Sequence, residues 1–386
     1  MTMKGANFLE KLLDNQPVEW KKLGEVCDIK TGKGVTKKDA VEDGVYPIIS
    51  GGKTPMDYID KYNRDANTVT VSRVGANAGY VNYLGEKFYL NDKCFSVIPR
   101  IDYIHSKFLY YILKVREQQI TAMQSLGGVP TINTSKVGSI EIPLPPLSVQ
   151  SRIVEILDKF TSLEAELEAE LELRKKQYAY YREQLLNFSY TPPPSKFNVV
   201  YRKLGEVAQY SKGRIDASTL SAKNYVGVDN LLQDCQGKKL SEHVPTEGRC
   251  TAYSPKDILI GNIRPYLKKI WFADNAGGTN GDVLVIQTTD ERVLPEYLYQ
   301  VLSDDAFFTY DMQHAKGAKM PRGNKDKILD YKIPLPPLSE QQRIVEILDK
   351  FDTLTNSISE GLPLEIQLRR QQYEYYREQL LAFPHP

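Results

Sequence analysis

The chain has 386 residues, enough for two or three domains that each bury a core, and too many for one small domain. Hydrophobic residues make up 41% and charged residues 26% of the sequence. No stretch approaches the roughly 20 apolar residues that a membrane-spanning helix needs, so we expect a soluble protein. The formal net charge of +1 excludes a basic field over the whole surface. Any binding to a nucleic acid must therefore depend on local basic patches.

Neither a signal for export nor a cysteine framework is visible in the sequence. Residues 1–16 lack the apolar core and the small-residue cleavage site of a secretory signal. The cysteines Cys27, Cys94, Cys235 and Cys250 form no C-x-x-C pair, which argues against a zinc site and against disulfides. We therefore expect a cytoplasmic protein with reduced thiols.

Residues 1–141 predict a short N-terminal helix followed by a sheet-rich domain. Short β-branched and aromatic runs, such as Thr68–Val71 and Phe95–Ile98, are separated by Gly, Asn and Asp, which is typical of strands and turns. A helix is expected over Ile104–Gln118, ahead of a glycine-containing loop. Together these elements predict an α+β domain.

Loops of this first domain carry candidate contacts to DNA. Lysines on glycine-containing loops suit phosphate groups, while Arg and Asn side chains match the edges of guanine and adenine respectively. The candidates in this half are Lys33, Lys37, Lys38, Lys53, Arg73 and Asn77. The alternative for each single residue is a solvated surface charge or a turn former.

Residues 142–190 predict one long helix. Pro145 and Pro146 cannot lie inside it, and Ser148 is the expected N-cap. Apolar and aromatic residues recur along it at steps of three and four, namely Ile153, Ile156, Phe160, Leu163, Leu167, Leu171, Tyr178, Tyr181, Leu185 and Phe188. A helix from Ser148 to Phe188 would be about 60 Å long, too long to be stable alone in water, so its apolar stripe needs a partner.

Residues 191–332 predict a linker and a second domain of the same kind. The linker is YTPPPSK, Tyr190–Lys196. Strands are expected at Ile258–Ile260 and Val283–Ile286, and a helix at Pro295–Leu302. The segment Ala315–Lys327 has five basic residues against one acidic residue, which suits a strip that contacts phosphates. The candidates in this half are Lys212, Arg214, Asn262, Arg264, Lys268, Lys269, Lys316, Lys319, Arg322 and Lys325.

Residues 333–386 repeat the first long helix. Ile333–Phe351 differs from Ile142–Phe160 at two positions only, where Glu340 and Gln342 replace Val149 and Ser151. A second match joins Tyr178–Phe188 to Tyr373–Phe383, and KLGEV occurs at both Lys22–Val26 and Lys203–Val207. The chain is therefore a tandem duplication.

The second helix departs from the first by one extra step of four residues, which is a coiled-coil stutter. It falls around Gly361, Leu362 and Pro363, where glycine and proline favour a kink or a break. Ser339 is the expected N-cap here. The simplest partner for each apolar stripe is its own duplicate, so we predict that the two helices pair as a coiled coil. The alternative is a generic core-facing or scaffold helix.

Patterns for catalysis are missing from the sequence. GGKT at Gly51–Thr54 lacks the glycine five residues earlier that a phosphate-binding loop needs, because Pro47 stands there. The four histidines show no metal or catalytic-triad spacing. The glutamates from Glu164 to Glu172 alternate every second position and are expected to be solvated helix surface. The Asp/Asn-Pro-Pro-aromatic tetrapeptide of adenine methyltransferases is also missing, so we expect a non-enzymatic chain without a cofactor of its own.

The phrase I-P-L-P-P-L-S-x-Q-x-R-I-V-x-x-L-D, at Ile142–Asp158 and again at Ile333–Asp349, resembles the signature of specificity subunits of type I restriction-modification systems. The resemblance covers the whole chain, because such subunits have two target-recognition domains, each followed by a long helix. It implies domain boundaries at 1–141, 142–190, 191–332 and 333–386. It also implies an antiparallel coiled coil with pseudo-twofold symmetry, and domains that each recognise one half of a bipartite target in double-stranded DNA.

The resemblance also implies partners. Two modification subunits would carry S-adenosylmethionine and methylate adenine, and restriction or translocase subunits would use ATP and magnesium. The run LEAELEAELE, Leu163–Glu172, is similar to short repeats that set domain separation in some members of the family. Four added residues lengthen a helix by about 6 Å, against about 3.4 Å for a DNA base pair, so one insertion would change the spacing by one or two base pairs.

Three other functions remain as alternatives. A self-contained methyltransferase or nuclease would require a cofactor or metal constellation. A coiled-coil scaffold or adaptor without DNA binding fits the near-neutral charge, but it leaves the paired basic loops unexplained. A specificity subunit of a related system with fused methylase and nuclease would have the same architecture.

Overall fold

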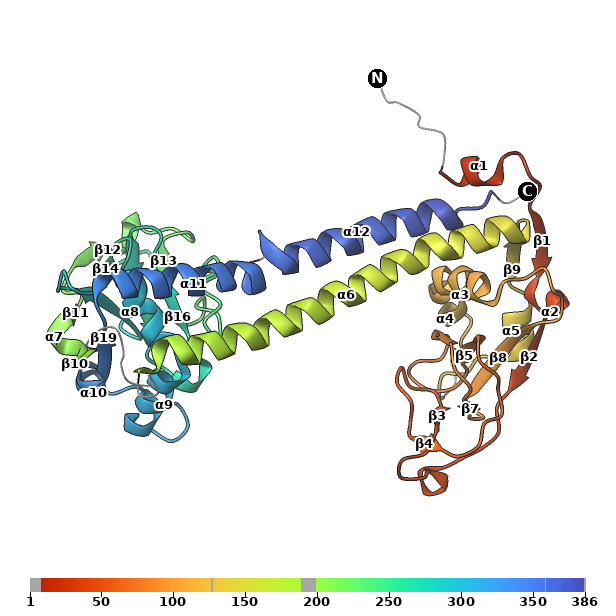
Figure 1. The fold of residues 1–386 in the computed structure, drawn as a ribbon, viewed down its shortest axis with the longest axis horizontal. Coiled ribbons are helices and arrows are strands. Elements are labelled where there is room, and N and C mark those ends of the chain that lie inside the picture. Colours follow the sequence, from red (N-terminus) through yellow and green to blue (C-terminus); the bar gives the residue numbers. More distant parts are fainter. Residues whose placement is uncertain (1–7, 126–127, 189–198, 358, 385–386) are drawn as a thin grey trace. The chain divides into compact units, whose positions relative to one another are not determined.

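The computed structural model describes residues 8–125, 128–188, 199–357 and 359–384 (Figure 1). It divides into two compact units: unit 1 contains residues 1–166 and 367–386, and unit 2 contains residues 167–366. Each unit therefore combines one sheet-rich domain, the start of the helix that follows it, and the end of the other long helix. The four segments of the sequence remain an interpretation by chain position, and the linker Tyr190–Lys196 lies outside the described residues.

Unit 1 is built around an antiparallel four-stranded sheet in the order β2-β8-β5-β6. A three-stranded sheet, β4-β3-β7, and a two-stranded pair, β1-β9, complete it. The elements are α1 Phe8–Leu13, β1 Glu19–Lys22, α2 Leu23–Val26, β2 Cys27–Thr31, η1 Lys37–Asp39, β3 Tyr46–Ile49, β4 Tyr58–Ile59, β5 Thr68–Ser72, β6 Val81–Leu84, β7 Tyr89–Leu90, β8 Cys94–Pro99, α3 Ser106–Val115, α4 Glu117–Ala122, α5 Thr134–Gly138 and β9 Glu141–Leu144.

Unit 2 has the same central arrangement, an antiparallel sheet in the order β11-β18-β15-β16. Beside it lie the sheet β12-β14-β17-β13 and the pair β10-β19. The elements are β10 Val200–Lys203, α7 Leu204–Val207, β11 Ala208–Tyr210, β12 Arg214–Asp216, η3 Ala217–Thr219, β13 Tyr225–Val226, β14 Arg249–Tyr253, β15 Ile258–Gly261, η4 Pro265–Leu267, β16 Ile270–Phe272, β17 Gly277–Thr279, β18 Val283–Thr288, α8 Pro295–Leu302, α9 Asp305–His314, α10 Lys325–Asp330 and β19 Lys332–Leu335.

The four strands and the short N-terminal helix expected from the sequence are confirmed, as is the helix Pro295–Leu302. The expected helix Ile104–Gln118 is split into α3 and α4, with Arg116 between them. Helix α9 was not expected. It begins after Asp304, whose side chain accepts a hydrogen bond from the Ala306 amide and caps it.

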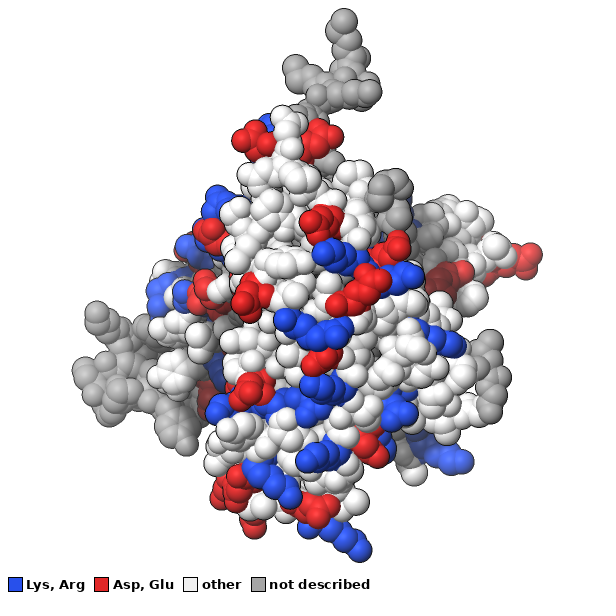
Figure 2. All heavy atoms as spheres, turned by 90° about the vertical axis from the view of Figure 1, so that its right-hand side faces the viewer, with Lys and Arg blue, Asp and Glu red and all other residues white. Residues whose placement is uncertain are grey.

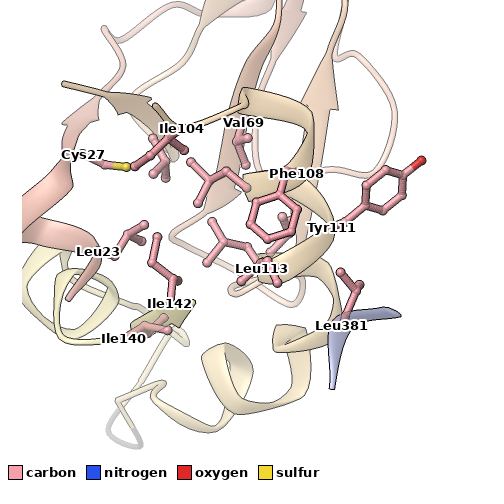
Figure 3. Packing of buried hydrophobic residues seen from close by; sticks show 14 of the residues in the cluster. Leu23, Cys27, Val69, Ile104, Phe108, Tyr111, Leu113, Ile140, Ile142 and Leu381 are labelled. Carbon is pink, nitrogen blue, oxygen red and sulfur yellow. The ribbon is translucent and has the colours of Figure 1, made fainter. Parts of the chain in front are cut away.

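The core of unit 1 includes the C-terminal end of the chain. Figure 3 shows Phe108 and Leu113 of α3 packed among Val69, Ile142 and their neighbours, with Leu381 at the edge of the same cluster. Leu380, Leu381 and Phe383 are all buried there. The first domain is therefore completed by residues that lie at the other end of the sequence.

The first long helix is confirmed as one element, α6 Leu147–Leu186, with 40 residues. The expected N-caps Ser148 and Ser339 are wrong, because both serines lie inside the first helical turn. In the second copy Pro337 holds the N-cap position without a side-chain cap. A proline can do so because its restricted backbone already supplies the extended conformation that precedes a helix.

The second long helix is broken, as the sequence predicted. It forms α11 Leu338–Asn356 and α12 Gly361–Leu381. Gly361 has a φ of +76°, and a Cβ atom there would lie 2.8 Å from the carbonyl oxygen of Leu354. Glycine permits this left-handed turn and this close approach of the backbone.

Aromatic stacking joins two helix segments within each unit. In unit 1 the Phe160 ring of α6 stacks on Tyr376 of α12, with ring centroids 5.4 Å apart. In unit 2 the Phe351 ring of α11 stacks on Tyr178 and Tyr181 of α6, at 5.9 and 5.5 Å. By the repeat, Phe351 corresponds to Phe160 and Tyr181 to Tyr376. The same contact therefore occurs in both units.

The segments of unit 1 run antiparallel. Phe160 lies near Tyr373 and Tyr376, and Glu164, one turn further along α6, forms an ion pair with Arg370, earlier in α12. Glu164 is thus a pairing residue and is less solvated than the sequence suggested. Pairing of the two helices as a coiled coil over their whole length stays a prediction.

A buried glutamine fixes the start of each long helix to its domain. The Gln150 side chain accepts a hydrogen bond from the His105 amide at 2.9 Å and donates to the carbonyl oxygens of Tyr103 and Pro145 at 2.9 and 2.8 Å. Gln341 makes the equivalent three bonds in unit 2. These contacts explain the glutamine in the repeated phrase.

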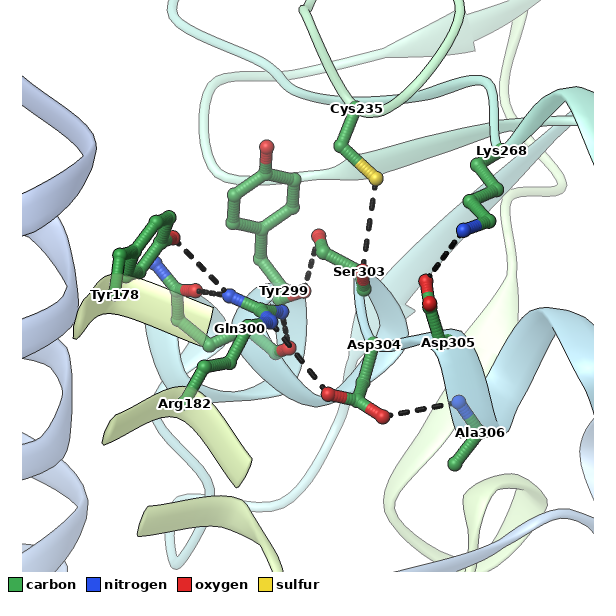
Figure 4. A network of polar contacts seen from close by, with 10 residues as sticks. All are labelled: Tyr178, Arg182, Cys235, Lys268, Tyr299, Gln300, Ser303, Asp304, Asp305 and Ala306. Atoms are coloured by element: carbon green, nitrogen blue, oxygen red, sulfur yellow. Dashed lines mark hydrogen bonds and ion pairs between the residues drawn. The ribbon is translucent and has the colours of Figure 1, made fainter. Parts of the chain in front are cut away.

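The end of α6 is fixed to unit 2 by a polar network (Figure 4). The Arg182 guanidinium donates to the Gln300 side chain at 2.7 Å and lies 3.5 Å from the Asp304 carboxylate. Gln300 in turn donates to Asp349 of α11 at 2.8 Å. One domain therefore holds both helix segments of its unit.

We expect Gln341→Leu to lower the free energy of unfolding by about 3 kcal/mol, because it leaves buried backbone donors and acceptors without partners. Chemical denaturation of the full chain measures this change. Gln342→Leu is the matched control, since Gln342 is the exposed neighbour. Equal, small effects of the two substitutions would contradict the anchoring role of Gln341.

Candidate nucleic-acid interface

Several loops of unit 1 meet at one end of its central sheet. The ends of β2 and β5 both lie beside the start of β8, because Thr31 pairs with Phe95 and Ser72 pairs with Cys94. This pairing places Lys33, just after β2, and Arg73, just after β5, at the same end of the sheet.

Backbone hydrogen bonds attach a further loop to this end. The Gly75 amide donates to the Pro130 carbonyl at 3.0 Å, and the Ile132 amide donates to the Arg73 carbonyl at 2.8 Å. The Asn77 side chain donates to the Gly51 carbonyl at 3.1 Å, which brings the Lys53 loop to the same place. Four candidate residues of the first half are therefore gathered in one region.

Unit 2 repeats the two backbone hydrogen bonds of this arrangement. The Arg264 amide donates to the Pro321 carbonyl at 2.7 Å, and the Gly323 amide donates to the Asn262 carbonyl at 3.0 Å. Lys316 and Arg322 exchange backbone hydrogen bonds at 2.9 and 2.8 Å. The structure thus aligns Asn262 with Arg73, and it brings the basic strip against the loop that contains Arg264.

Two candidates of unit 1 are engaged within the protein. The Arg73 guanidinium lies over the Phe95 ring, with its Cζ atom 5.5 Å from the ring centroid, and donates to the Asp92 carbonyl at 3.3 Å. Asn77 uses its amide to hold the Gly51 loop. Both side chains therefore help to fix the loops, and their contact with base edges stays a prediction.

Three candidates of unit 2 are also engaged. The Lys268 ammonium lies 2.6 Å from the Asp305 carboxylate, a contact visible in Figure 4, and this hydrogen bond raises the pKa of Lys268. The Lys269 ammonium donates to the Val228 carbonyl, and burial lowers its pKa. Asn262 is only 6% exposed. These three are poor candidates for direct contact with DNA unless the loops rearrange.

The remaining candidates have exposed side chains. They are Lys33, Lys37, Lys38 and Lys53 in unit 1, and Lys212, Arg214, Arg264, Lys316, Lys319, Arg322 and Lys325 in unit 2. Arg214 donates to the Thr251 hydroxyl at 3.3 Å, and Arg322 lies 3.2 Å from Asp282. Both of these contacts are at the surface, where they leave the guanidinium open to a phosphate.

The sequence did not single out Lys93, which the structure places in the interface of unit 1. Its side chain is exposed, and its carbonyl accepts a hydrogen bond from the Arg73 amide at 2.8 Å. In unit 2 the same carbonyl position belongs to Asp282, which accepts from Asn262 at 2.8 Å. No local pattern marks Lys93, because its place depends on the pairing of β5 with β8.

The surface carries local rather than global positive charge. On the face of the molecule in Figure 2, lysine, arginine and acidic side chains are interspersed, and basic side chains are more frequent toward the lower part. This distribution agrees with the net charge of +1. Binding to a polyanion at this protein would depend on where basic side chains cluster.

No other chemical site emerges from the described residues. Within them, no group of three or more His, Cys, Asp or Glu side chains is placed to hold a metal ion. All four cysteines are free, and burial raises the pKa of the Cys27 thiol to about 12. None of the helices in the described part of the chain is long and apolar enough to cross a membrane.

A buried carboxylate lies behind the interface of unit 2. Asp311 of α9 is 1% exposed, and both of its carboxylate oxygens lack a hydrogen-bond partner, as does the side-chain oxygen of Asn262. A Cβ atom on Gly323 would lie 2.5 Å from Asp311 Oδ1 and 2.8 Å from Asn262 Oδ1, so these oxygens converge on one point. Burial raises the pKa of Asp311 to about 6.

We expect Asp311→Asn to stabilise unit 2 at pH 8. The pKa of this carboxyl is about 3.8 in the unfolded chain and about 6 in the folded chain. The protonated carboxyl therefore contributes its full stabilisation below about pH 3.8, and the folded state loses about 3 kcal/mol of stability as the pH rises through about 6. Thermal unfolding between pH 4 and pH 8 measures this slope. An equal loss of stability at every pH in Asp311→Asn would contradict the account.

The chain is similar to known proteins over almost its whole length. A family model described as the type I restriction modification DNA specificity domain matches residues 15–173 and 196–368. The specificity subunit of a type I restriction enzyme from Escherichia coli is 31% identical, over 100% of this chain and 99% of its own length.

Solved structures show the same fold. The crystal structure of a type I restriction-modification S subunit from M. genitalium matches with a TM-score of 0.63 and 18% identity, over 97% of this chain and 98% of that one. A chain from a study of complex assembly in the type I restriction-modification system matches with a TM-score of 0.55 and 16% identity, over 95% of this chain and 98% of that one. Because the family model covers most of the chain and the relative from Escherichia coli is 31% identical over its whole length, the chain belongs to the family of type I restriction-modification specificity subunits.

Proposed function

We propose that this chain recognises a bipartite sequence in double-stranded DNA, with each sheet-rich domain contacting one half of the target. The observation that carries the proposal is the repeated loop scaffold. Both units place the same hydrogen-bonded loops at the same end of the central sheet, and both surround them with exposed basic side chains. Lysine and arginine on such loops supply phosphate contacts, which position a protein on a duplex.

The long helices would set the distance between the half-sites and dock the modification subunits. The repeated phrase exposes one leucine in each copy, Leu147 at 43% and Leu338 at 44%. In unit 2 this leucine lines a surface hollow together with Val200, Arg202 and Pro336. An exposed apolar position that is identical in both copies suits two copies of the same partner.

Catalysis would belong to the partners. Two modification subunits would bind S-adenosylmethionine and methylate adenine, and restriction or translocase subunits would bind ATP and magnesium. This chain would be a non-catalytic component that recognises the target sequence and holds the other subunits together. It would act in the cytoplasm. A related system with fused methylase and nuclease would use the same chain architecture.

The competing proposal is a scaffold or adaptor that does not bind DNA. Its support is the interspersed surface charge (Figure 2) and the net charge of +1. It does not explain why basic side chains are exposed around equivalent loops in both units. A methyltransferase or nuclease within this chain has no supporting observation in the sequence.

The proposal predicts methyladenine in a single bipartite motif of cellular DNA when this chain is expressed with its modification subunit. Single-molecule methylome sequencing with and without the chain measures this outcome and gives the spacer length directly. Unchanged methylation, together with a purified complex that binds DNA without sequence preference, would favour the scaffold proposal.

A matched pair of variants separates DNA contact from scaffolding in the same assay. Lys316→Glu with Lys319→Glu places negative charge on the basic strip and is expected to reduce methylation of the motif strongly. Lys256→Gln is the control, because Lys256 is exposed and precedes β15, at the opposite end of this strand from Asn262, and glutamine can still donate a hydrogen bond to the Glu296 carboxylate that pairs with Lys256. Equal methylation by both variants would argue against phosphate contacts from this strip.

A further inference from the structure

We infer that Arg264, together with Met320 and Arg322, distinguishes the half-target of unit 2 from that of unit 1. This inference rests on the proposed function. It starts from the backbone match between Gly75 and Arg264, whose amides donate to the equivalent carbonyls of Pro130 and Pro321. The two residues therefore occupy the same place on the same scaffold.

The position requires a left-handed backbone. Gly75 has a φ of +97°, and Arg264 has a φ of +55°. Glycine adopts this conformation without steric cost, whereas a residue with a Cβ atom is strained there. Unit 2 thus carries a long, exposed arginine at a place where the fold favours glycine. A strained residue that the local fold does not need points to a function of its side chain.

The neighbouring loop differs between the units in the same way. The backbone of this loop is alike in both units, because Pro130 matches Pro321, and because Asn133 and Asn324 cap the equivalent helices α5 and α10. The two residues that flank the proline differ. Unit 1 has Val129 and Thr131, whereas unit 2 has Met320 and Arg322.

These differing residues are accessible. Val129 is 65% exposed and Met320 is 52% exposed, although both are apolar. Arg322 is exposed, and Asp282 at 3.2 Å orients its guanidinium. Because the Arg264 amide is bonded to Pro321, the three side chains belong to adjacent backbone positions. All three side chains are exposed, and unit 1 has Gly75, Val129 and Thr131 at the matching positions.

The chemistry of these three side chains suits direct contact with bases in a groove of DNA. An arginine can donate two hydrogen bonds to the O6 and N7 atoms of guanine, and an apolar side chain can contact the methyl group of thymine. By contrast, Lys33 and Arg214 lie at equivalent positions, six residues after the starts of β2 and β11, and both side chains are basic. Residues shared by the units suit phosphates, which are alike in both half-sites, whereas residues that differ suit bases.

Arg264→Gly is the decisive variant, because it restores the residue that the conformation favours. We expect its melting temperature to equal or exceed that of the native chain. In the methylome of cells with the modification subunit, we expect one position of one half-site to lose discrimination by roughly 10- to 100-fold. The other half-site and the spacer should be unchanged.

Two further variants sharpen the test. Arg264→Lys keeps the charge but loses the two-bond geometry, so it should also relax that position. Gly75→Ala tests whether the equivalent position of unit 1 needs glycine, and it should lower the melting temperature without changing the motif.

The outcomes distinguish this inference from the proposed function. If the native chain produces no motif, the proposed function fails. If the native chain produces a motif and Arg264→Gly leaves every position of it unchanged, the inference fails and the proposed function stands. A uniform loss of methylation over all targets by a stable Arg264→Gly chain also overturns the inference, because it marks a phosphate contact.

Discussion

The structure depends on the aromatic contact between helix segments of different repeats. In unit 1, Phe160 of the first helix stacks on Tyr376 of the second, and in unit 2, Phe351 of the second helix stacks on Tyr178 of the first. Each domain is completed by the end of the other repeat's helix: Leu381 is buried in unit 1, and Leu185 and Leu186 pack, partly buried, against the core of unit 2. The duplicated helix ends must therefore stay alike, because both fill the same kind of core.

The residues of the two repeats are therefore of two kinds, those that both copies share and those that differ between them. The residues that the copies share, such as Gln150 and Gln341, make buried contacts that hold domain and helix together. The residues that differ include the exposed loop residues at the end of each central sheet, such as Gly75 and Arg264. The proposed recognition of a bipartite target would use such an arrangement, because the supporting backbone would be common to both halves while the side chains that contact bases would differ.

Much of the fold follows from local patterns. Periodicity and repeats predict the two long helices, the break near Gly361 and the main strands. The helix starts could not be predicted well, because Pro337 replaces the expected serine cap. For the candidate interface, the sequence identifies the basic loops, but it does not show which of their side chains are engaged in contacts within the protein. Lys268 is paired with Asp305, and Lys269 bonds the Val228 carbonyl, and both partners are far away in the sequence.

The most direct test of the account is hydrogen exchange on the complex with its modification subunits, with and without DNA containing the methylated motif. DNA is expected to protect amides in two matched loop sets, residues 73–77 and 128–132 in unit 1, and residues 262–269 and 316–323 in unit 2. Protection confined to one unit, or to the long helices, would contradict the claim that both domains contact the target through these loops.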